Sequence, residues 1–324
     1  MRAPAFWSRR TPLSTLLAPL GALYAGAGRL RRWVATPQDA AVPVVCIGNL
    51  VAGGAGKTPV AIAVARHLMA RDIEIRFLSR GYGGTLNGPV RVLPGVHDAA
   101  DVGDEPLLLA EVAPCWIAKD RVAGAHAAAA DGAQVIVMDD GHQNASLRKT
   151  VSMVVVDGET GFGNGRVMPA GPLREPVTPG LARADAAVVI GEDRAGVAGQ
   201  LPAGLPVLHG ALEPVGDSGA LSGETVFGFA GIGRPAKFRA TLEALGCTVA
   251  GWREFPDHHP YRRAEIEAIL RDAGAAGAIA VTTEKDAVRL PLDLRQSIRT
   301  VGVHVTWREP ELLDRILPET GPDG

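Results

Sequence analysis

The stretch that decides the fold reads Val44-Val45-Cys46-Ile47-Gly48 and, after four more residues, Gly53-Gly54-Ala55-Gly56-Lys57-Thr58. The first part is an apolar run, which predicts a buried β-strand, and Thr58 begins a helical pattern. Between them, glycines let backbone N–H groups approach phosphate oxygens, Lys57 adds a positive charge, and the helix N-terminus adds its dipole. The hydroxyl of Thr58 suits Mg²⁺. We therefore predict that Gly53, Gly54, Ala55, Gly56, Lys57 and Thr58 bind ATP with Mg²⁺.

One position departs from the usual phosphate-loop motif, GxxxxGK[ST], which has glycine where this chain has Val51. Taken alone, the residues would also suit a glycine-rich turn that carries a surface lysine. The strand before the loop and the helix after it favour the nucleotide site.

Apolar runs alternate with helical patterns around this motif. The predicted strands are Val42–Gly48, Glu74–Ser79, Cys115–Ala118, Val135–Asp139, Ser152–Val156 and Ala186–Ile190, and the predicted helices are Thr58–Ala70, Glu105–Val112 and Arg121–Ala130. Most of these strands are apolar throughout, as expected when helices cover both faces of a sheet. The order predicts an α/β fold, a P-loop NTPase-like doubly wound sheet.

Glycine and proline become frequent between Gly191 and Gly223, and a second alternation follows. Its predicted strands are Val226–Ala230, Val249–Trp252 and Ala278–Thr282, and its predicted helices are Pro235–Leu245 and Arg263–Ala273. We predict a domain boundary near residue 220. The expected parts are an N-terminal helix in 1–35, a P-loop domain in 36–220 and a second, smaller α/β domain in 221–324.

The N-terminal segment Thr11–Gly28 carries no charge and has arginines on both sides. These are Arg9, Arg10, Arg29, Arg31 and Arg32. Prolines and glycines make the segment marginal as a spanning helix, which needs about 20 apolar residues. It resembles a secretory signal in outline, but a nucleotide loop follows it. We expect a helix on the membrane surface with its arginines on anionic head groups, and a core-packing helix stays the alternative.

The overall charge and the cysteines exclude other classes of protein. A formal net charge of −2 provides no global field for nucleic acid. The three cysteines, Cys46, Cys115 and Cys247, lack disulfide or metal-site spacing and fit a reducing compartment. No pattern indicates an obligate protein partner.

Carboxylates follow a second apolar run, Val135–Met138, as Asp139-Asp140-Gly141. Ligands of α/β sheets collect at the carboxyl ends of strands, and a nucleotide site needs a carboxylate there to hold Mg²⁺. An Asp-Gly turn is the alternative for this motif alone. A third carboxylate, Asp104, begins a helical pattern and is either an N-cap or a general base.

With these segments assembled, the chain resembles the tetraacyldisaccharide 4'-kinase family of lipid A biosynthesis. The matching segments are Gly48–Leu50, Gly53–Pro59, Leu78–Gly83, Val102–Pro106, Asp139–Gln143, Phe162–Gly165, Met168–Glu175, Phe229–Ile232, Phe255–Tyr261 and Thr282–Asp286. The resemblance implies an ATP-dependent kinase that phosphorylates the 4'-hydroxyl of a tetraacylated disaccharide 1-phosphate. It also implies a location at the cytoplasmic face of the inner membrane, with the second domain closing over the site.

The resemblance implies roles for individual residues. Asp104 matches the family's proposed catalytic base and His258 the histidine paired with it, beside Lys57 of the phosphate loop. Asp139 and Asp140, together with Thr58, match metal ligands, and Gln143 matches a residue of the nucleotide site. The implied substrate-binding residues are Glu105, Arg121, Arg174 and Tyr82. Taken alone, Arg121 and Arg174 would be solvated surface arginines.

Two departures and one alternative remain. His142-Gln143-Asn144 stands where the family has Gln-His at the last two positions, so no imidazole occupies position 144. His259 beside His258 leaves the choice of paired histidine open.

The alternative function is a P-loop switch or chaperone ATPase that acts on a protein partner. Such proteins often have lysine at the position of Ala52, and its absence favours the kinase.

Overall fold

Twelve strands form one mixed sheet in a computed structural model that describes residues 4–216 and 221–318. They are β1 (Val44–Gly48), β2 (Ile75–Ser79), β3 (Val90–Arg91), β4 (Cys115–Ile117), β5 (Val135–Asp139), β6 (Val151–Asp157), β7 (Ala186–Ile190), β8 (Val207–Gly216), β9 (Thr225–Ala230), β10 (Thr248–Glu254), β11 (Ile279–Thr283) and β12 (Arg299–Trp307). Their order in the sheet is β10-β9-β11-β12-β8-β7-β6-β1-β5-β2-β4-β3. Neighbours run parallel except at the β12–β8 and β3–β4 pairs.

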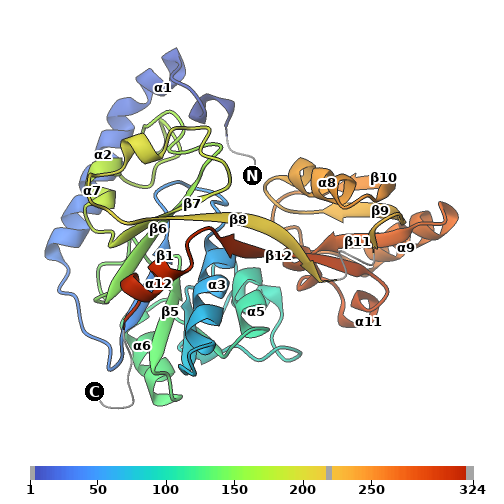
Figure 1. The fold of residues 1–324 in the computed structure, drawn as a ribbon, viewed down its shortest axis with the longest axis horizontal. Coiled ribbons are helices and arrows are strands. Elements are labelled where there is room, and N and C mark those ends of the chain that lie inside the picture. Colours follow the sequence, from blue (N-terminus) through green and yellow to red (C-terminus); the bar gives the residue numbers. More distant parts are fainter. Residues whose placement is uncertain (1–3, 217–220, 319–324) are drawn as a thin grey trace.

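Helices cover the sheet (Figure 1). Those described are α1 (Pro12–Leu16), α2 (Ala18–Val34), α3 (Lys57–Met69), α4 (Ala99–Val102), α5 (Asp104–Ala110), α6 (Arg121–Ala130), α7 (Val177–Leu181), α8 (Pro235–Ala244), α9 (Arg263–Ala275), α10 (Glu284–Ala287), α11 (Leu292–Arg295) and α12 (Glu311–Ile316). The predicted elements at β5, β7 and α6 match residue for residue, and the other predicted elements differ by a few residues at their ends. The predicted α/β fold class is confirmed.

We call strands β1 to β8 the first part of the sheet and strands β9 to β12 the second part. Strand β1 lies inside the first part, between β5 and β6. Its side chains alternate between two cores: Val45 and Ile47 pack in the cluster that includes α3, and Val44 and Cys46 pack in the cluster that includes α6. After β1 the chain builds strands first on one side and then on the other, so the loop that follows β1 lies at the switch point of the sheet. Parallel α/β sheets bind their ligands at this point.

The two parts of the sheet meet through an antiparallel pair that the sequence did not reveal. β8 and β12 pair over seven residue positions, from Val301 opposite Gly216 to Trp307 opposite Gly210. Residues 217–220, where the domain boundary was predicted, lie outside the described residues. The division of the chain into domains stays a prediction.

The end of the described chain returns to the first part of the molecule. After β12, helix α12 packs on α3: Leu313 and Leu317 lie in the core cluster of the phosphate-loop helix, and Asp314 contacts His67 at 2.8 Å. The core beneath the phosphate loop is therefore completed by residues that lie about 250 positions later in the chain.

Helix α2 lies on the outside of the molecule and buries only Gly21 and Ala25. A Cβ at Gly21 would lie 2.6 Å from the carbonyl oxygen of Val167, so glycine is required for this close contact. Large apolar side chains of the helix are exposed, with Leu23 at 70% and Trp33 at 83%. The alternative of a core-packing helix is therefore wrong. Within the described residues, no helix is long and apolar enough to cross a bilayer.

Candidate active site

The loop between β1 and α3 leaves its backbone open to a ligand. Gly53 and Gly56 have φ values of +117° and +82°, a region that favours glycine. Among the described residues, apart from the adjoining ones in the chain, no heavy atom lies within 4 Å of the position of a Cβ at Gly53 or Gly54. Gly56 caps α3, and Lys57 is its first residue, so the helix N-terminus points at this open space. The arrangement suits a polyphosphate.

Thr58 and Asp139 lie together beneath the loop. The Thr58 hydroxyl donates to Oδ2 of Asp139 at 3.0 Å. Asp139 is 1% exposed, and its Oδ1 is buried without a hydrogen-bond partner among the described residues. Burial raises the pKa of Asp139 to about 7, the charge of Glu105 adds to the rise, and Lys57 opposes it. Oxygen atoms from a hydroxyl and a carboxylate are the ligands that Mg²⁺ takes beside phosphates, and Thr58 and Asp139 supply one of each.

The described residues contain no group of three or more His, Cys, Asp or Glu side chains placed to hold a metal ion. Mg²⁺ commonly takes only one or two protein carboxylates and completes its shell with phosphates and water. Thr58 and Asp139 therefore fit this metal.

Asp140 has a left-handed backbone, with φ +52°, and its carboxylate faces two cations. Arg174 donates to both of its oxygens, at 2.7 and 3.1 Å, and Lys57 lies 3.9 Å away. Burial opposes ionisation, but Lys57 and Arg174 hold the pKa of Asp140 below its ordinary value. Gln143 lies beside this group and donates to the carbonyl oxygen of Asn49, next to the phosphate loop.

Asp104 and His258 form a second pair, although they lie 154 residues apart in the chain. Nδ1 of His258 lies 2.8 Å from Oδ2 of Asp104, which is only 4% exposed. Gly103 caps α5 and Asp104 is the first residue of the helix, so the N-cap alternative is wrong. His259 contacts Glu265 at 3.0 Å instead, so His258 is the histidine paired with Asp104.

The surroundings of Asp104 keep it ionised. Lys285 and Arg289 lie 3.9 and 3.7 Å from its Oδ2. Burial opposes ionisation, but the hydrogen bond from His258 and the charges of Lys285 and Arg289 hold the pKa of Asp104 below its ordinary value. Because a carboxylate only accepts, Nδ1 of His258 carries the proton of their hydrogen bond.

Arg289 is a residue of the site that sequence reasoning missed. It is 3% exposed and donates to the carbonyl oxygens of His259 and Gly231 at 3.1 and 3.0 Å. It also donates to the buried Asp286 at 2.6 Å. These bonds fix the segment that carries His258, whose φ is +58°. One signal in the sequence was available. Arg289 lies three residues after Asp286, the last residue of the matching segment Thr282–Asp286, and Asp and Arg at i and i+3 on a helix form pairs.

The remaining predicted substrate residues lie around the two pairs. Glu105 contacts Lys285 at 3.5 Å. Tyr82 is 71% exposed, and its ring centroid lies 6.4 Å from that of His258. Arg121 is 3% exposed and donates to the carbonyl oxygen of Ala118, so it is not a solvated surface arginine. Burial lowers its pKa to about 10.

Two other polar residues of the matching segments are structural. His142 is buried between the Ser152 hydroxyl at 2.9 Å and the Gly180 carbonyl oxygen at 3.0 Å, and burial lowers its pKa to about 4. Asn164 donates to the carbonyl oxygens of Phe6 and Ala170, each at 3.0 Å, and so ties the N-terminal segment to the turn at 164.

Comparisons with known proteins agree on one family. A family model described as tetraacyldisaccharide-1-P 4'-kinase matches residues 13–320. The tetraacyldisaccharide 4'-kinase of Rhodospirillum centenum is 54% identical over 98% of this chain and 96% of its own length. That of Rhodospirillum rubrum is 53% identical over 98% of both chains. A crystal structure of LpxK from Aquifex aeolicus in complex with ATP matches with a TM-score of 0.76 and 27% identity, over 94% of this chain and 100% of that one.

Proposed function

Because the chain belongs to the tetraacyldisaccharide-1-P 4'-kinase family, we propose that Asp104 is the general base of that family's reaction. The protein is a kinase that transfers the γ-phosphate of ATP to the 4'-hydroxyl of a tetraacylated disaccharide 1-phosphate in lipid A biosynthesis. The observation that carries the proposal is the 2.8 Å contact between His258 and the buried, ionised Asp104.

In the proposed step, Asp104 accepts the proton of the 4'-hydroxyl as its oxygen attacks the γ-phosphorus. His258 donates a hydrogen bond from Nδ1 to Asp104 and fixes the orientation of the carboxylate, and its Nε2 lies 3.8 Å from Oδ1 of Asp257. Asp104 needs to be deprotonated before the step, and its lowered pKa meets this need at neutral pH. General bases of this kind contribute about 10²–10⁴-fold to the rate.

The phosphate loop and its carboxylates have a separate role in the proposal. Lys57 and the backbone of Gly53–Gly56 bind the β- and γ-phosphates, and Thr58 and Asp139 are the residues that would hold Mg²⁺. When bound, Mg²⁺ would neutralise negative charge on the phosphate oxygens. Asp140 is oriented by Arg174, stays ionised and places its negative charge beside Lys57.

The general base is tested with Asp104→Asn, which keeps the size of the side chain. The purified protein, ATP and the acylated disaccharide 1-phosphate in detergent micelles should yield ADP and a bisphosphorylated lipid. The variant should bind ATP as tightly as the unchanged protein while its kcat falls by about a hundredfold or more. A kcat within a few-fold of the unchanged protein would remove Asp104 as the base and leave the kinase activity itself intact.

We also propose that α2 lies on the cytoplasmic face of the inner membrane, where ATP is available. Its exposed apolar side chains are Leu20, Leu23, Tyr24, Leu30, Trp33 and Val34. Arg29 and Arg31 lie among them and suit anionic head groups. Flotation with anionic lipid vesicles tests this. Leu23→Ser with Trp33→Ser should weaken binding strongly, and binding unchanged by both would contradict the proposal.

A further inference from the structure

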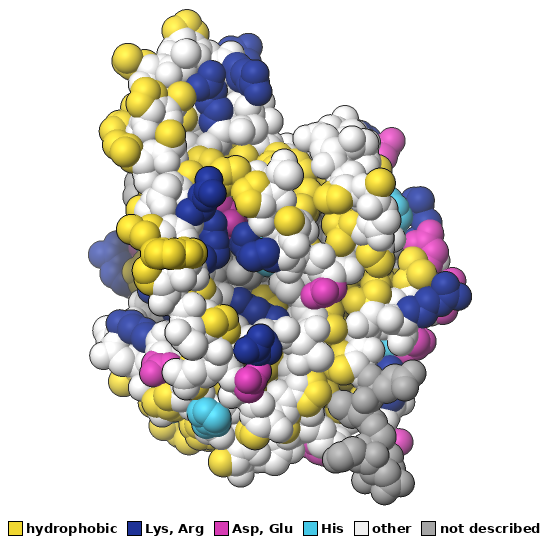
Figure 2. All heavy atoms as spheres, turned by 90° about the vertical axis from the view of Figure 1, so that its left-hand side faces the viewer, with side chains coloured by type: hydrophobic (Ala, Val, Ile, Leu, Met, Phe, Trp, Pro, Cys, Tyr) yellow, Lys and Arg dark blue, Asp and Glu magenta, His cyan; other side chains and the backbone are white. Residues whose placement is uncertain are grey.

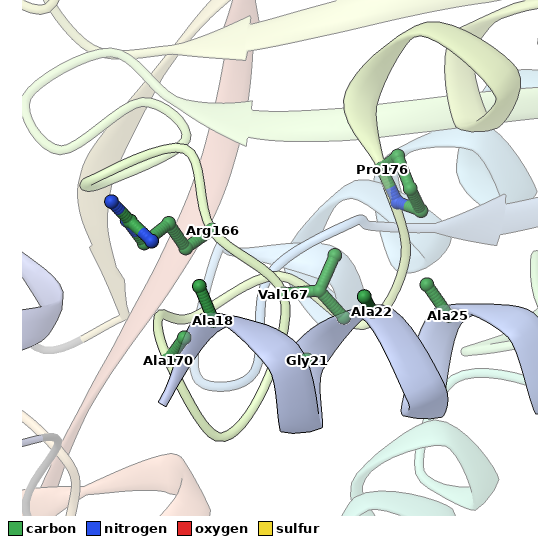
Figure 3. A pocket seen from close by; sticks show the side chains of 8 residues that line it. All are labelled: Ala18, Gly21, Ala22, Ala25, Arg166, Val167, Ala170 and Pro176. Atoms are coloured by element: carbon green, nitrogen blue, oxygen red, sulfur yellow. The ribbon is translucent and has the colours of Figure 1, made fainter. Parts of the chain in front are cut away.

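Phosphoryl transfer needs positive charge beside the transferred phosphate, so the position of each cationic side chain matters. Figure 2 shows the side of the molecule that α2 covers, opposite the second part in Figure 1, where Lys and Arg side chains gather beside hydrophobic ones. Figure 3 shows α2 beside the loop of Val167, where Arg166 lines a small hollow and donates to the Thr15 hydroxyl. The basic side chains that contact Asp104 come instead from the residues after β10 and β11, and they are His258, Lys285 and Arg289.

Arg289 is fully engaged by the protein. It is 3% exposed, and each of its three side-chain nitrogens already donates to a protein oxygen. One of these bonds runs from Nε to the carbonyl oxygen of Lys285 at 3.1 Å and holds the backbone of α10. Thr283 caps the same helix by accepting from the N–H of Asp286 at 3.1 Å. Arg289 therefore fixes this turn and has no nitrogen left for a ligand.

Lys285, the second residue of α10, has a fixed backbone but a free ammonium group. Its Nζ lies 3.5 Å from Oε1 of Glu105 and 3.9 Å from Oδ2 of Asp104. It makes no hydrogen bond to the described residues, and the side chain is 29% exposed. Because an ammonium group has three donors, all three remain available to an anion that enters the site.

Glu105 connects Lys285 with the phosphate side of the site. Burial raises the pKa of Asp139, and the negative charge of Glu105 adds to the rise, so these two carboxylates lie near each other. Lys285 thus contacts both the proposed base and a neighbour of the metal pair. The phosphoryl group passes from the phosphate loop to a hydroxyl held at Asp104, so it has to cross the region beside this ammonium group.

The charges of the site explain why Lys285 would change partners when ATP binds. The γ-phosphate brings further negative charge to a region that already holds Asp104, Glu105 and Asp139. A long ionic contact at a partly exposed position, such as that of Lys285 with Glu105, is weak. A lysine ammonium sits on a flexible four-carbon stem, so it can move to a phosphate oxygen while the backbone stays in place.

We propose that Lys285 is a catalytic residue whose ammonium group binds an oxygen of the γ-phosphate and stabilises the negative charge of the transition state. In this step the 4'-oxygen forms a bond to the γ-phosphorus, and the bond from the γ-phosphorus to the β–γ bridging oxygen breaks. ADP leaves with that electron pair, and Asp104 takes the proton of the hydroxyl. The inference rests on the proposed function, because Asp104 marks the position of the attacking hydroxyl.

The test measures single-turnover rates with ATP, Mg²⁺ and the acylated disaccharide 1-phosphate in detergent micelles. Lys285→Met keeps the length of the side chain, removes its charge and should lower the rate about a hundredfold, the usual scale for one charge-stabilising group. Lys285→Arg keeps the charge and should stay within tenfold of the unchanged protein. Binding of ADP, which lacks the γ-phosphate, should change less than twofold in both variants.

The matched control is Lys237→Met, which removes an exposed lysine of α8 in the second part. It should leave both the rate and the binding of ADP unchanged. Because Lys237 and Lys285 have the same side chain, the control accounts for the general loss of one positive charge from this region.

The pH profile separates contact with the phosphate from an effect through Asp104. Burial opposes the ionisation of Asp104, and the hydrogen bond from His258 and the charge of Lys285 hold its pKa down. Loss of Lys285 therefore raises that pKa, and a lysine that acts only through Asp104 would give a loss that disappears at pH 9. Contact with the γ-phosphate predicts that the hundredfold loss persists at pH 9.

A rate of Lys285→Met within fivefold of the unchanged protein at pH 9 would overturn the proposal. An equal loss in Lys237→Met, a loss in Lys285→Arg as large as in Lys285→Met, or ADP binding weakened about tenfold would overturn it as well. Failure of the base assignment is distinguishable, because Asp104→Asn would then stay active while Lys285→Met still loses about a hundredfold at pH 9.

Discussion

The Thr58–Asp139 pair and the Asp104–His258 pair serve one site but are built differently. Asp139 is the last residue of β5, and Thr58 follows the parallel neighbour β1 through the phosphate loop, so the local sheet sets their separation. Asp104 and His258 are 154 residues apart and belong to parts of the sheet joined by the antiparallel strands β8 and β12. The first pair needs only the local fold to be correct, whereas the second also needs the two parts to be correctly placed. The proposed metal site should therefore be rigid and the proposed base adjustable.

The largest expected effect tests whether Asp104 and His258 act as a unit that is independent of Thr58. Asp104→Asn should lower kcat by about a hundredfold or more, and adding His258→Asn should lower it by no more than a few-fold further. Asp104→Asn with Thr58→Val should instead combine two independent losses, the second on the order of a hundredfold. Single-turnover rates of these three variants measure this. Independent losses for Asp104 and His258 would contradict a shared role.

His258→Asn alone should have a smaller effect with a distinct pH signature. Asparagine tolerates the positive φ of this position, so the backbone should be kept. His258 holds the pKa of Asp104 down, so its loss raises that pKa and moves the acid limb of the kcat profile to higher pH. We expect about a tenfold loss at pH 7 and less at pH 9.

His259→Asn is the matched control for this variant, because the His259 side chain contacts Glu265 instead. It should leave the acid limb in place. A shift in the control, with none in His258→Asn, would reverse the assignment of the two histidines.

Asp139→Asn should stabilise the protein while lowering its activity. The pKa of Asp139 is raised in the folded state to about 7 from an ordinary 3.8, so the unfolded chain loses this proton first as pH rises. The folded state therefore loses stability between about pH 4 and 7, and a neutral asparagine avoids this loss. Without Mg²⁺, the Tm of the variant should exceed that of the unchanged protein by a few degrees at pH 8 and by much less at pH 4.5. Equal differences at both pH values would contradict the raised pKa.

The smallest effect concerns a contact between the two parts that lies away from the chemistry. Arg234, just before α8, donates to Asp157 at the end of β6 at 2.9 Å. Because Arg234 is partly exposed, Arg234→Gln should lower kcat/KM only about two- to fivefold. Arg239→Gln, which removes an ion pair within α8, is the control and should have no effect. A loss larger than that of His258→Asn would show that this contact fixes the second part.

The sequence predicted what depends on short segments. The phosphate loop, the strand ending at Asp139 and the helix beginning at Arg121 follow from apolar runs and glycine spacing. β8 was not predicted because Gly210 and Pro214 interrupt its pattern, although Gly210 is required there: a Cβ would lie 2.8 Å from a methyl group of Val305 on β12. The contact of Asp104 with His258 rested on a resemblance, since no spacing rule relates residues so far apart. The role of Arg289 depends on carbonyl groups from two distant turns, which the sequence does not reveal.

The packing of α12 on α3 has a consequence for synthesis of the protein on the ribosome. Leu313 and Leu317 fill a gap in the core beneath the nucleotide loop, so that core stays open until residue 317 has left the exit tunnel. The first two hundred residues should therefore remain a loosely packed intermediate, with apolar surface available to chaperones, during most of translation. ATP-binding competence should therefore be acquired late, together with the part of the chain that carries His258.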